Sequence, residues 1–221
     1  MQEIFLFNSP PRSGNVFLMF LFRTFIGHPV DKCLDIKKYS DKSQKQAVFF
    51  RDPYDSIPST IVKVLVDSKI PFEEENIVYT IEHYAREYIE AIKEAKANYS
   101  NLYLGRSEDM MNDPVATIHD IALFFDFTIN KNHTENNNQV FAEIKQSMIE
   151  TEKTRVDRFG ETIVENLMTN HDGHLPREKD GLRVILDKLI RDLDVELVKE
   201  CYNEYVTITP TNAKEGQRWE Y

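Results

Sequence analysis

The chain has 221 residues, of which 41% are hydrophobic and 29% are charged, so it is long enough for one well-buried domain and short for two. Its formal net charge of −10 argues against a general nucleic-acid binder, because phosphate binding needs a basic face. No apolar run approaches the roughly 20 residues that cross a bilayer, and residues 1–3 lack the basic start of a signal peptide, so we expect no membrane span and a cytoplasmic location.

Alternating apolar runs and amphipathic segments predict an α/β fold. Apolar runs at 3–7 and 47–50 predict strands buried on both faces, and 101–104 is a third strand candidate. Helical patterns are predicted at 16–26, 56–66, 76–97, 114–125, 140–152, 161–168 and 182–200. The order predicts a single domain, 1–221, with a core at 1–127, a polar loop at 128–138 and a helical C-terminal part at 138–221. Such an order favours a mainly parallel sheet flanked by helices, with ligands at the carboxyl ends of its strands.

The loop after the first predicted strand has the composition of an anion cradle. Backbone N–H groups of Ser13, Gly14 and Asn15 would lie unpaired at a helix start, where phosphate or sulfate binds. Gly14 permits close backbone approach, and Arg12 adds a forked cationic donor. The alternative is an ordinary turn whose arginine points into solvent. The loop is not a Walker A motif, because no lysine follows Gly14.

A second candidate corner follows the next strand. Arg51 ends that strand and Ser59 lies eight residues later in the following helix, so both could grip one anion. Asp52 or Asp55 is expected to cap the helix or to orient Arg51, and Ser56 or Asp55 is the candidate N-cap of the predicted helix. The alternative is a purely structural Arg–Asp pair at a strand end.

The two corners together resemble the sulfotransferases that use 3′-phosphoadenosine-5′-phosphosulfate. The first motif of that family is similar to Pro11, Arg12, Ser13, Gly14, Asn15 and Val16. Its second motif is similar to Arg51, Pro53, Asp55 and Ser59. Softer similarities lie at 26–31 and 107–127, so the resemblance covers about residues 3–66 and 101–127. It implies a P-loop-like three-layer fold.

The resemblance also implies roles for particular residues. Residues 11–16 would hold the 5′-phosphosulfate, and Arg51 with Ser59 would hold the 3′-phosphate. Arg177 and Lys179 belong to a stretch, 170–183, that resembles a basic loop closing over the nucleotide, although a charged surface loop is an equal alternative. No metal is implied, since arginines and backbone N–H groups can neutralise the donor. The family usually has Thr-Thr where Asn15 and Val16 stand, so hydroxyl contacts to the donor are lost.

The expected chemistry is an in-line sulfuryl transfer, in which positioning and stabilisation of the leaving phosphate dominate. Arg12 is the candidate stabiliser. The general base is left open among His28, Asp35, Glu108, His171 and His174. His83 and His119 fall inside helical patterns and are expected to pack, and a stripe containing Tyr79, Tyr84 and Tyr88 is interpreted as core rather than as an acceptor pocket.

We therefore expect a sulfotransferase that acts on a hydroxyl or amine of a small-molecule or carbohydrate acceptor and releases adenosine 3′,5′-bisphosphate. Two alternatives stay open: a small P-loop nucleotide kinase, and a catalytically silent sulfotransferase-like binding protein. The missing Walker lysine disfavours the kinase, whereas Asn15 and Val16 keep the silent relative open.

Overall fold

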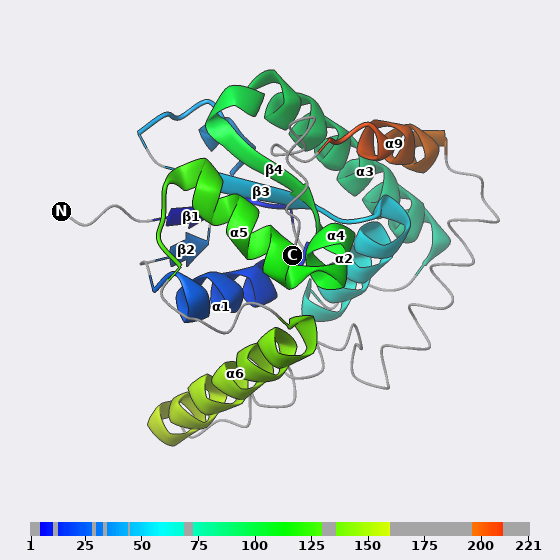
Figure 1. The fold of residues 1–221 in the computed structure, drawn as a ribbon. Helices are drawn as coiled ribbons and strands as arrows, with labels where there is room; N and C mark the ends of the chain where they lie inside the picture. Colours follow the sequence, from blue (N-terminus) through cyan, green and yellow to red (C-terminus); the bar gives the residue numbers. More distant parts are fainter. Residues whose placement is uncertain are drawn as a thin grey trace.

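The structure, a computed structural model, is an α/β fold in which helices cover both faces of a parallel sheet (Figure 1). It describes residues 5–10, 13–27, 30–32, 35–43, 45–68, 73–129, 136–159 and 196–209. Within this part of the chain, no helix is both long enough and apolar enough to cross a membrane.

Four parallel strands form the sheet, in the order β2-β1-β3-β4. Their bounds are β1(Phe5–Phe7), β2(Val30–Lys32), β3(Gln46–Phe50) and β4(Leu102–Arg106). The three strands predicted from apolar runs are confirmed, and all five residues of β3 are buried, as a continuous apolar run predicts. The edge strand β2 was not predicted, because Val30-Asp31-Lys32 has a single apolar residue and no readable alternation.

The helices of the described residues are α1(Asn15–Phe25), α2(Pro53–Ser68), α3(Glu74–Ala97), α4(Ser107–Asn112), α5(Pro114–Phe125), α6(Asn137–Phe159) and α9(Glu196–Val206). Helix α2 begins at Pro53 rather than near Ser56, since proline is well suited to a first helical position. The segment between β4 and α5, where no helix was predicted, contains the short helix α4. The predicted helix at 161–168 lies outside the described residues.

Each face of the sheet has its own hydrophobic core. On one face, Phe7, Ala47, Phe49 and Tyr103 pack with buried residues of α1, α5 and the first turns of α6. On the other face, Val48, Phe50, Leu102 and Leu104 pack with α2, α3 and α9. Alternate residues of each strand thus enter opposite cores, as the two-residue period of a strand requires. In Figure 1, α9 lies along α3, whereas α6 extends away from the sheet beyond α1.

The strand order reverses direction between β1 and β3. After β1, the chain passes through α1 on one face and returns as β2, on one side of β1. After β3, which lies on the other side of β1, it passes through α2 and α3 on the opposite face and returns as β4. The first turns of α1 and α2 therefore diverge from neighbouring strands, which is where open parallel sheets form a ligand crevice.

Candidate functional site

The two corners identified in the sequence lie at the ends of neighbouring strands. Strands β1 and β3 pair directly, with Phe7 opposite Ala47. Beyond the end of β1, the buried Ser9 Oγ accepts a hydrogen bond of 2.8 Å from the Phe49 backbone N–H. The loop that leads to α1 is therefore held against the strand that leads to Arg51. The two corners are adjacent because β1 and β3 are neighbours in the sheet, an order that could not be read from the sequence.

The first corner ends in a glycine that begins α1. Gly14 is the N-cap residue, with φ of 75° in the left-handed region that favours glycine, and its carbonyl accepts from the Leu18 N–H at 3.0 Å. A Cβ at this position would lie 2.9 Å from Met110 Cε. No side chain of the described residues caps α1. The backbone N–H groups of its first turn are therefore the donors that an anion could use.

Ser13 fixes the backbone of the same corner. The Ser107 hydroxyl, at the start of α4, donates to the Ser13 carbonyl at 2.8 Å, and both side chains are buried. The Ser13 hydroxyl is itself buried and has no hydrogen-bond partner among the described residues. Burying an unpaired hydroxyl is unfavourable, which marks this position as one where a polar ligand would be stabilising.

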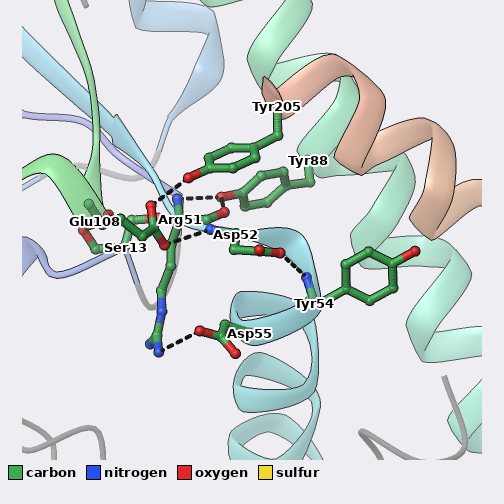
Figure 2. Close-up of polar contacts among 9 residues, drawn as sticks. Ser13, Arg51, Asp52, Tyr54, Asp55, Tyr88, Glu108 and Tyr205 are labelled. Carbon is green, nitrogen blue, oxygen red and sulfur yellow. Dashed lines mark hydrogen bonds and ion pairs between the residues drawn. The ribbon is translucent and has the colours of Figure 1, made fainter. Parts of the chain in front are cut away.

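The second corner is organised by the backbone of Arg51. The Tyr88 hydroxyl, from α3, accepts from the Arg51 N–H at 2.8 Å and donates to the Arg51 carbonyl at 2.5 Å (Figure 2). Both backbone groups just past the end of β3 are thus paired by one buried side chain. Burial raises the pKa of the Tyr88 hydroxyl, while its hydrogen bond with the Arg51 backbone acts in the opposite direction. The Tyr88 hydroxyl is consequently neutral and holds the Arg51 backbone through hydrogen bonds.

Asp52 and Asp55 take one each of the two roles expected at the second corner, capping of the helix and pairing with Arg51. The Asp52 carboxylate accepts from the Tyr54 N–H at 2.9 Å and so caps the start of α2. The Asp55 carboxylate lies 3.3 Å from Arg51 Nη2. The Arg51 side chain is 24% exposed and Asp55 48%, so the guanidinium is held near the surface rather than locked inside. This i,i+4 pair is the structural arrangement that the sequence left as an alternative, and it leaves part of the guanidinium accessible.

Glu108, on α4, connects the second corner to the C-terminal helix. Its two carboxylate oxygens accept from the Asp52 N–H at 2.9 Å and from the Tyr205 hydroxyl at 2.5 Å (Figure 2). Burial and the hydrogen bond to Glu108 raise the pKa of Tyr205, in that order. Both oxygens of Glu108 are thus engaged, and through them Glu108 positions the Asp52 backbone and the Tyr205 side chain.

Arg106 holds α9 in place from the end of β4. Its guanidinium donates to the carbonyls of Val206 and Ile208 at 2.8 and 2.7 Å, at the C-terminal end of α9 where cations are stabilising. The same guanidinium lies 5.4 Å from the centre of the Tyr205 ring. No local sequence pattern indicates these contacts, since they join residues about 100 positions apart.

The structure brings Ser13 and Gly14 to the same end of the sheet as Arg51 and Ser59, since β1 and β3 are neighbouring strands. Ser59 lies in α2 and is 1% exposed, so its hydroxyl reaches an anion only if binding opens the corner. Asn15 and Val16 contribute backbone to the first turn of α1. The remaining predicted site residues lie outside the described residues: Pro11, Arg12, His28, His171, His174, Arg177 and Lys179.

Asp35 is the base candidate that the structure places beside the first corner. The Asn8 side chain, just past β1, accepts from the Asp35 N–H at 2.8 Å and donates to its carbonyl at 2.7 Å. This two-point clamp fixes the half-buried Asp35 next to the start of the loop. His119 is half-buried, in accord with packing, whereas His83 is exposed and lies 3.6 Å from Glu87, so its expected packing role is wrong.

The tyrosine stripe of α3 is only partly core. Tyr88 is buried, Tyr84 is intermediate and Tyr79 is 73% exposed, because these three positions do not share one face of the helix. The described residues contain no group of three or more His, Cys, Asp or Glu side chains placed to hold a metal ion. Comparison of the chain with models of protein families, and with curated protein sequences, gives no match.

Proposed function

We propose that this protein is a sulfotransferase that moves a sulfuryl group from 3′-phosphoadenosine-5′-phosphosulfate to a hydroxyl or amine of a small-molecule or carbohydrate acceptor. The observation that supports the proposal best is the meeting of two anion-suited corners at one crevice. Ser13 and Gly14 follow β1, and Arg51 follows its neighbour β3. A ligand with one anionic group at each end would span two such corners. The same proposal includes a P-loop-like arrangement of the first strand, loop and helix.

The reaction assigned to this crevice is a direct displacement. The acceptor oxygen or nitrogen attacks sulfur, and the new bond to sulfur forms as the bond from sulfur to the bridging phosphate oxygen breaks. The electron pair of the broken bond goes to that oxygen, which leaves as part of adenosine 3′,5′-bisphosphate, and the acceptor proton passes to a base. Nothing is oxidised or reduced. Donors at the start of α1 and the Arg12 guanidinium would stabilise the charge that grows on the leaving phosphate.

Within the described residues, Asp35 is the candidate that fits the role of base. Its backbone is clamped to Asn8, directly before the loop proposed to hold the phosphosulfate. A carboxylate held this way has a fixed position relative to the reacting group, which is the first requirement of general base catalysis. The proposal assigns Arg51, and Ser59 after opening of the corner, to the 3′-phosphate.

Calorimetry with adenosine 3′,5′-bisphosphate tests the assignment. We expect the bisphosphate to bind more tightly than ATP with Mg²⁺, and the Arg51→Ala variant to lose about tenfold or more of that affinity. Ser59→Ala should weaken binding less, because its hydroxyl is buried. Arg86→Ala is the matched control, since Arg86 also pairs with an acidic residue four positions away, at 3.5 Å from Glu82, but lies on an exposed face of α3.

Three results separate the alternatives. Tighter binding of ATP with Mg²⁺ would identify a nucleotide kinase instead. Equal loss in the Arg51→Ala and Arg86→Ala variants would mean that only net charge matters, and would remove the site assignment. Bisphosphate binding without transfer of labelled sulfate to any of a panel of acceptors would favour the catalytically silent relative, as Asn15 and Val16 allow.

A further inference from the structure

A cavity of about 160 Å³ lies beside the first corner, between the end of β1 and helices α2 and α3. Residues 8–10 form one wall, residues 35–39 a second, and α2 and α3 the others. Residues 8–10 run directly into the loop that begins α1, so the cavity adjoins the proposed phosphosulfate corner. Its volume is close to the 150 Å³ or so of a cavity known to accept a benzene ring. It therefore suits a ligand of small molecular size.

The charge of the cavity is negative. Asp35 and Glu87 are the charged residues among its described lining, and none of that lining is cationic. The Asp35 carboxylate accepts from the Lys37 N–H at 3.0 Å. The Glu87 carboxylate, 52% exposed, lies 3.6 Å from His83 at the surface. Two carboxylates at one small cavity repel the anionic nucleotide and attract a positive group.

The uncharged lining combines apolar and aromatic residues with four polar side chains, those of Asn8, Ser9, Ser56 and Thr60. Tyr39 and Ile57 are each 1% exposed, and Ala91 is 2% exposed, so this part of the wall is buried. Asp35 and Glu87 are more exposed than these residues, which puts the carboxylates toward the mouth. This gradient suits a molecule with an apolar body inside and a cationic group at the rim. The rings of Tyr39 and Tyr84 would add attraction for a cation.

A polar group in the wall also has no protein partner. The Ser56 hydroxyl, at the first turns of α2, is buried and has no hydrogen-bond partner among the described residues. By contrast, the neighbouring Thr60 hydroxyl donates to the Ser56 carbonyl at 2.8 Å. An unpaired buried hydroxyl is unfavourable, and a polar group of a ligand that pairs with it would remove that cost. This observation is independent of the charges at the mouth.

We propose that this cavity is a binding site for a small organic cation, with the apolar part of the ligand against Tyr39 and Ile57 and its ammonium group between Asp35 and Glu87. Its identification as the acceptor site of a sulfotransferase rests on the function proposed above, but the binding itself does not. If both hold, the acceptor is an amine-bearing molecule of about ten non-hydrogen atoms rather than a large carbohydrate.

Calorimetry or ligand-observed NMR with a matched pair of probes tests the cavity. Phenethylamine and phenethyl alcohol have the same shape, but only the amine is cationic at neutral pH. We expect the amine to bind at least about tenfold more tightly than the alcohol, because two carboxylates face it at reduced dielectric. The double variant Asp35→Asn, Glu87→Gln should bind both probes alike. Glu90→Gln removes an exposed carboxylate of α3 outside this cavity and should keep the preference.

Equal binding of the two probes to the native protein, or no saturable binding of either, would overturn the proposal. So would an equal loss of preference in the Glu90→Gln variant, since only the net charge of the protein would then matter. A separate titration with adenosine 3′,5′-bisphosphate distinguishes the two proposals. Amine binding without bisphosphate binding would leave the cation site and remove the sulfotransferase, and the converse result would leave the sulfotransferase with a different acceptor.

Discussion

Removing the Tyr88 hydroxyl should weaken the second corner more than any other single-atom change at that point. In the Tyr88→Phe variant the ring still fills its place in the core against Phe50, with ring centres 5.5 Å apart. The backbone N–H and carbonyl of Arg51, however, lose the partner that serves both of them. The substitution therefore isolates hydrogen bonding from packing.

The size of the effect follows from the two lost contacts. One intramolecular hydrogen bond contributes about 0.5–1.5 kcal/mol net, and leaving a buried partner unsatisfied adds a desolvation cost. Because Tyr88 is 6% exposed, water does not readily replace its hydroxyl. We expect a loss of about 2–4 kcal/mol in the free energy of unfolding, which for a chain of this size lowers Tm by roughly 4–16 °C.

Chemical denaturation followed by circular dichroism measures this loss. Tyr79→Phe is the matched control, because it removes the same atom from the same helix at a position that is 73% exposed, and it should change stability by less than about 0.5 kcal/mol. If the two variants unfold at the same denaturant concentration, the Arg51 backbone does not depend on Tyr88. The affinity of the folded Tyr88→Phe protein for adenosine 3′,5′-bisphosphate should also fall, because the Arg51 backbone is no longer held in place by the Tyr88 hydroxyl.

Two further predictions concern Glu108 and Asp120. Glu108→Ala should lower the free energy of unfolding by about 2–4 kcal/mol in denaturation experiments, because it removes the acceptor of two hydrogen bonds. Glu108→Gln keeps one side-chain oxygen and should recover part of that loss. Similar losses in both variants would argue against the acceptor role. Burial and the Asp113 carboxylate raise the pKa of Asp120 to about 6, so the folded state binds this proton more tightly than the unfolded state and stability from this group is lost as pH rises through about 6. Asp120→Asn should therefore raise Tm relative to the native chain at pH about 7.5, with the difference shrinking toward pH about 4, and a constant difference across that range would exclude the titration.

The parts of the fold that could be predicted are those with a clear local signal, such as a continuous apolar run or a glycine at a helix end. The apolar run at 47–50 is long enough to define β3, and the helix-stop glycine at position 27 marks the end of α1 correctly. Strand β2 and helix α4 were not predicted because they are short and mostly polar. Neither is long enough to show the hydrophobic periodicity of a strand or a helix. Asp52 and Asp55 were both expected near Arg51, but only the structure assigns capping to one and pairing to the other.

The parts of the site that could not be predicted depend on contacts between distant segments. Tyr88 was interpreted as core, and its burial agrees, yet its hydrogen bonds to Arg51 arise from the crossing of α3 over the end of β3. Glu108 was predicted only as a candidate base, and its hydrogen bond with Tyr205, 97 residues away on another helix, could not be read from the sequence. The cavity next to Asp35 is likewise formed by four separate segments. Such placements follow from packing, which a single sequence does not state.

The C-terminal part of the chain is structurally joined to the proposed nucleotide-binding core. Helix α9 contributes Val198, Cys201 and Tyr205 to the same hydrophobic cluster as β3, β4, α2 and α3. The first turns of α6 contribute to the cluster on the other face. A chain that ended at residue 127 would lose part of both cores, and Glu108 would lose the hydroxyl that holds its second oxygen. The helix start beside Arg51 is thus supported from the far end of the sequence, through Tyr205, Glu108 and Asp52 in turn. A mutation in α9 can therefore change the second corner without touching any ligand, by releasing the carboxylate that fixes the Asp52 backbone.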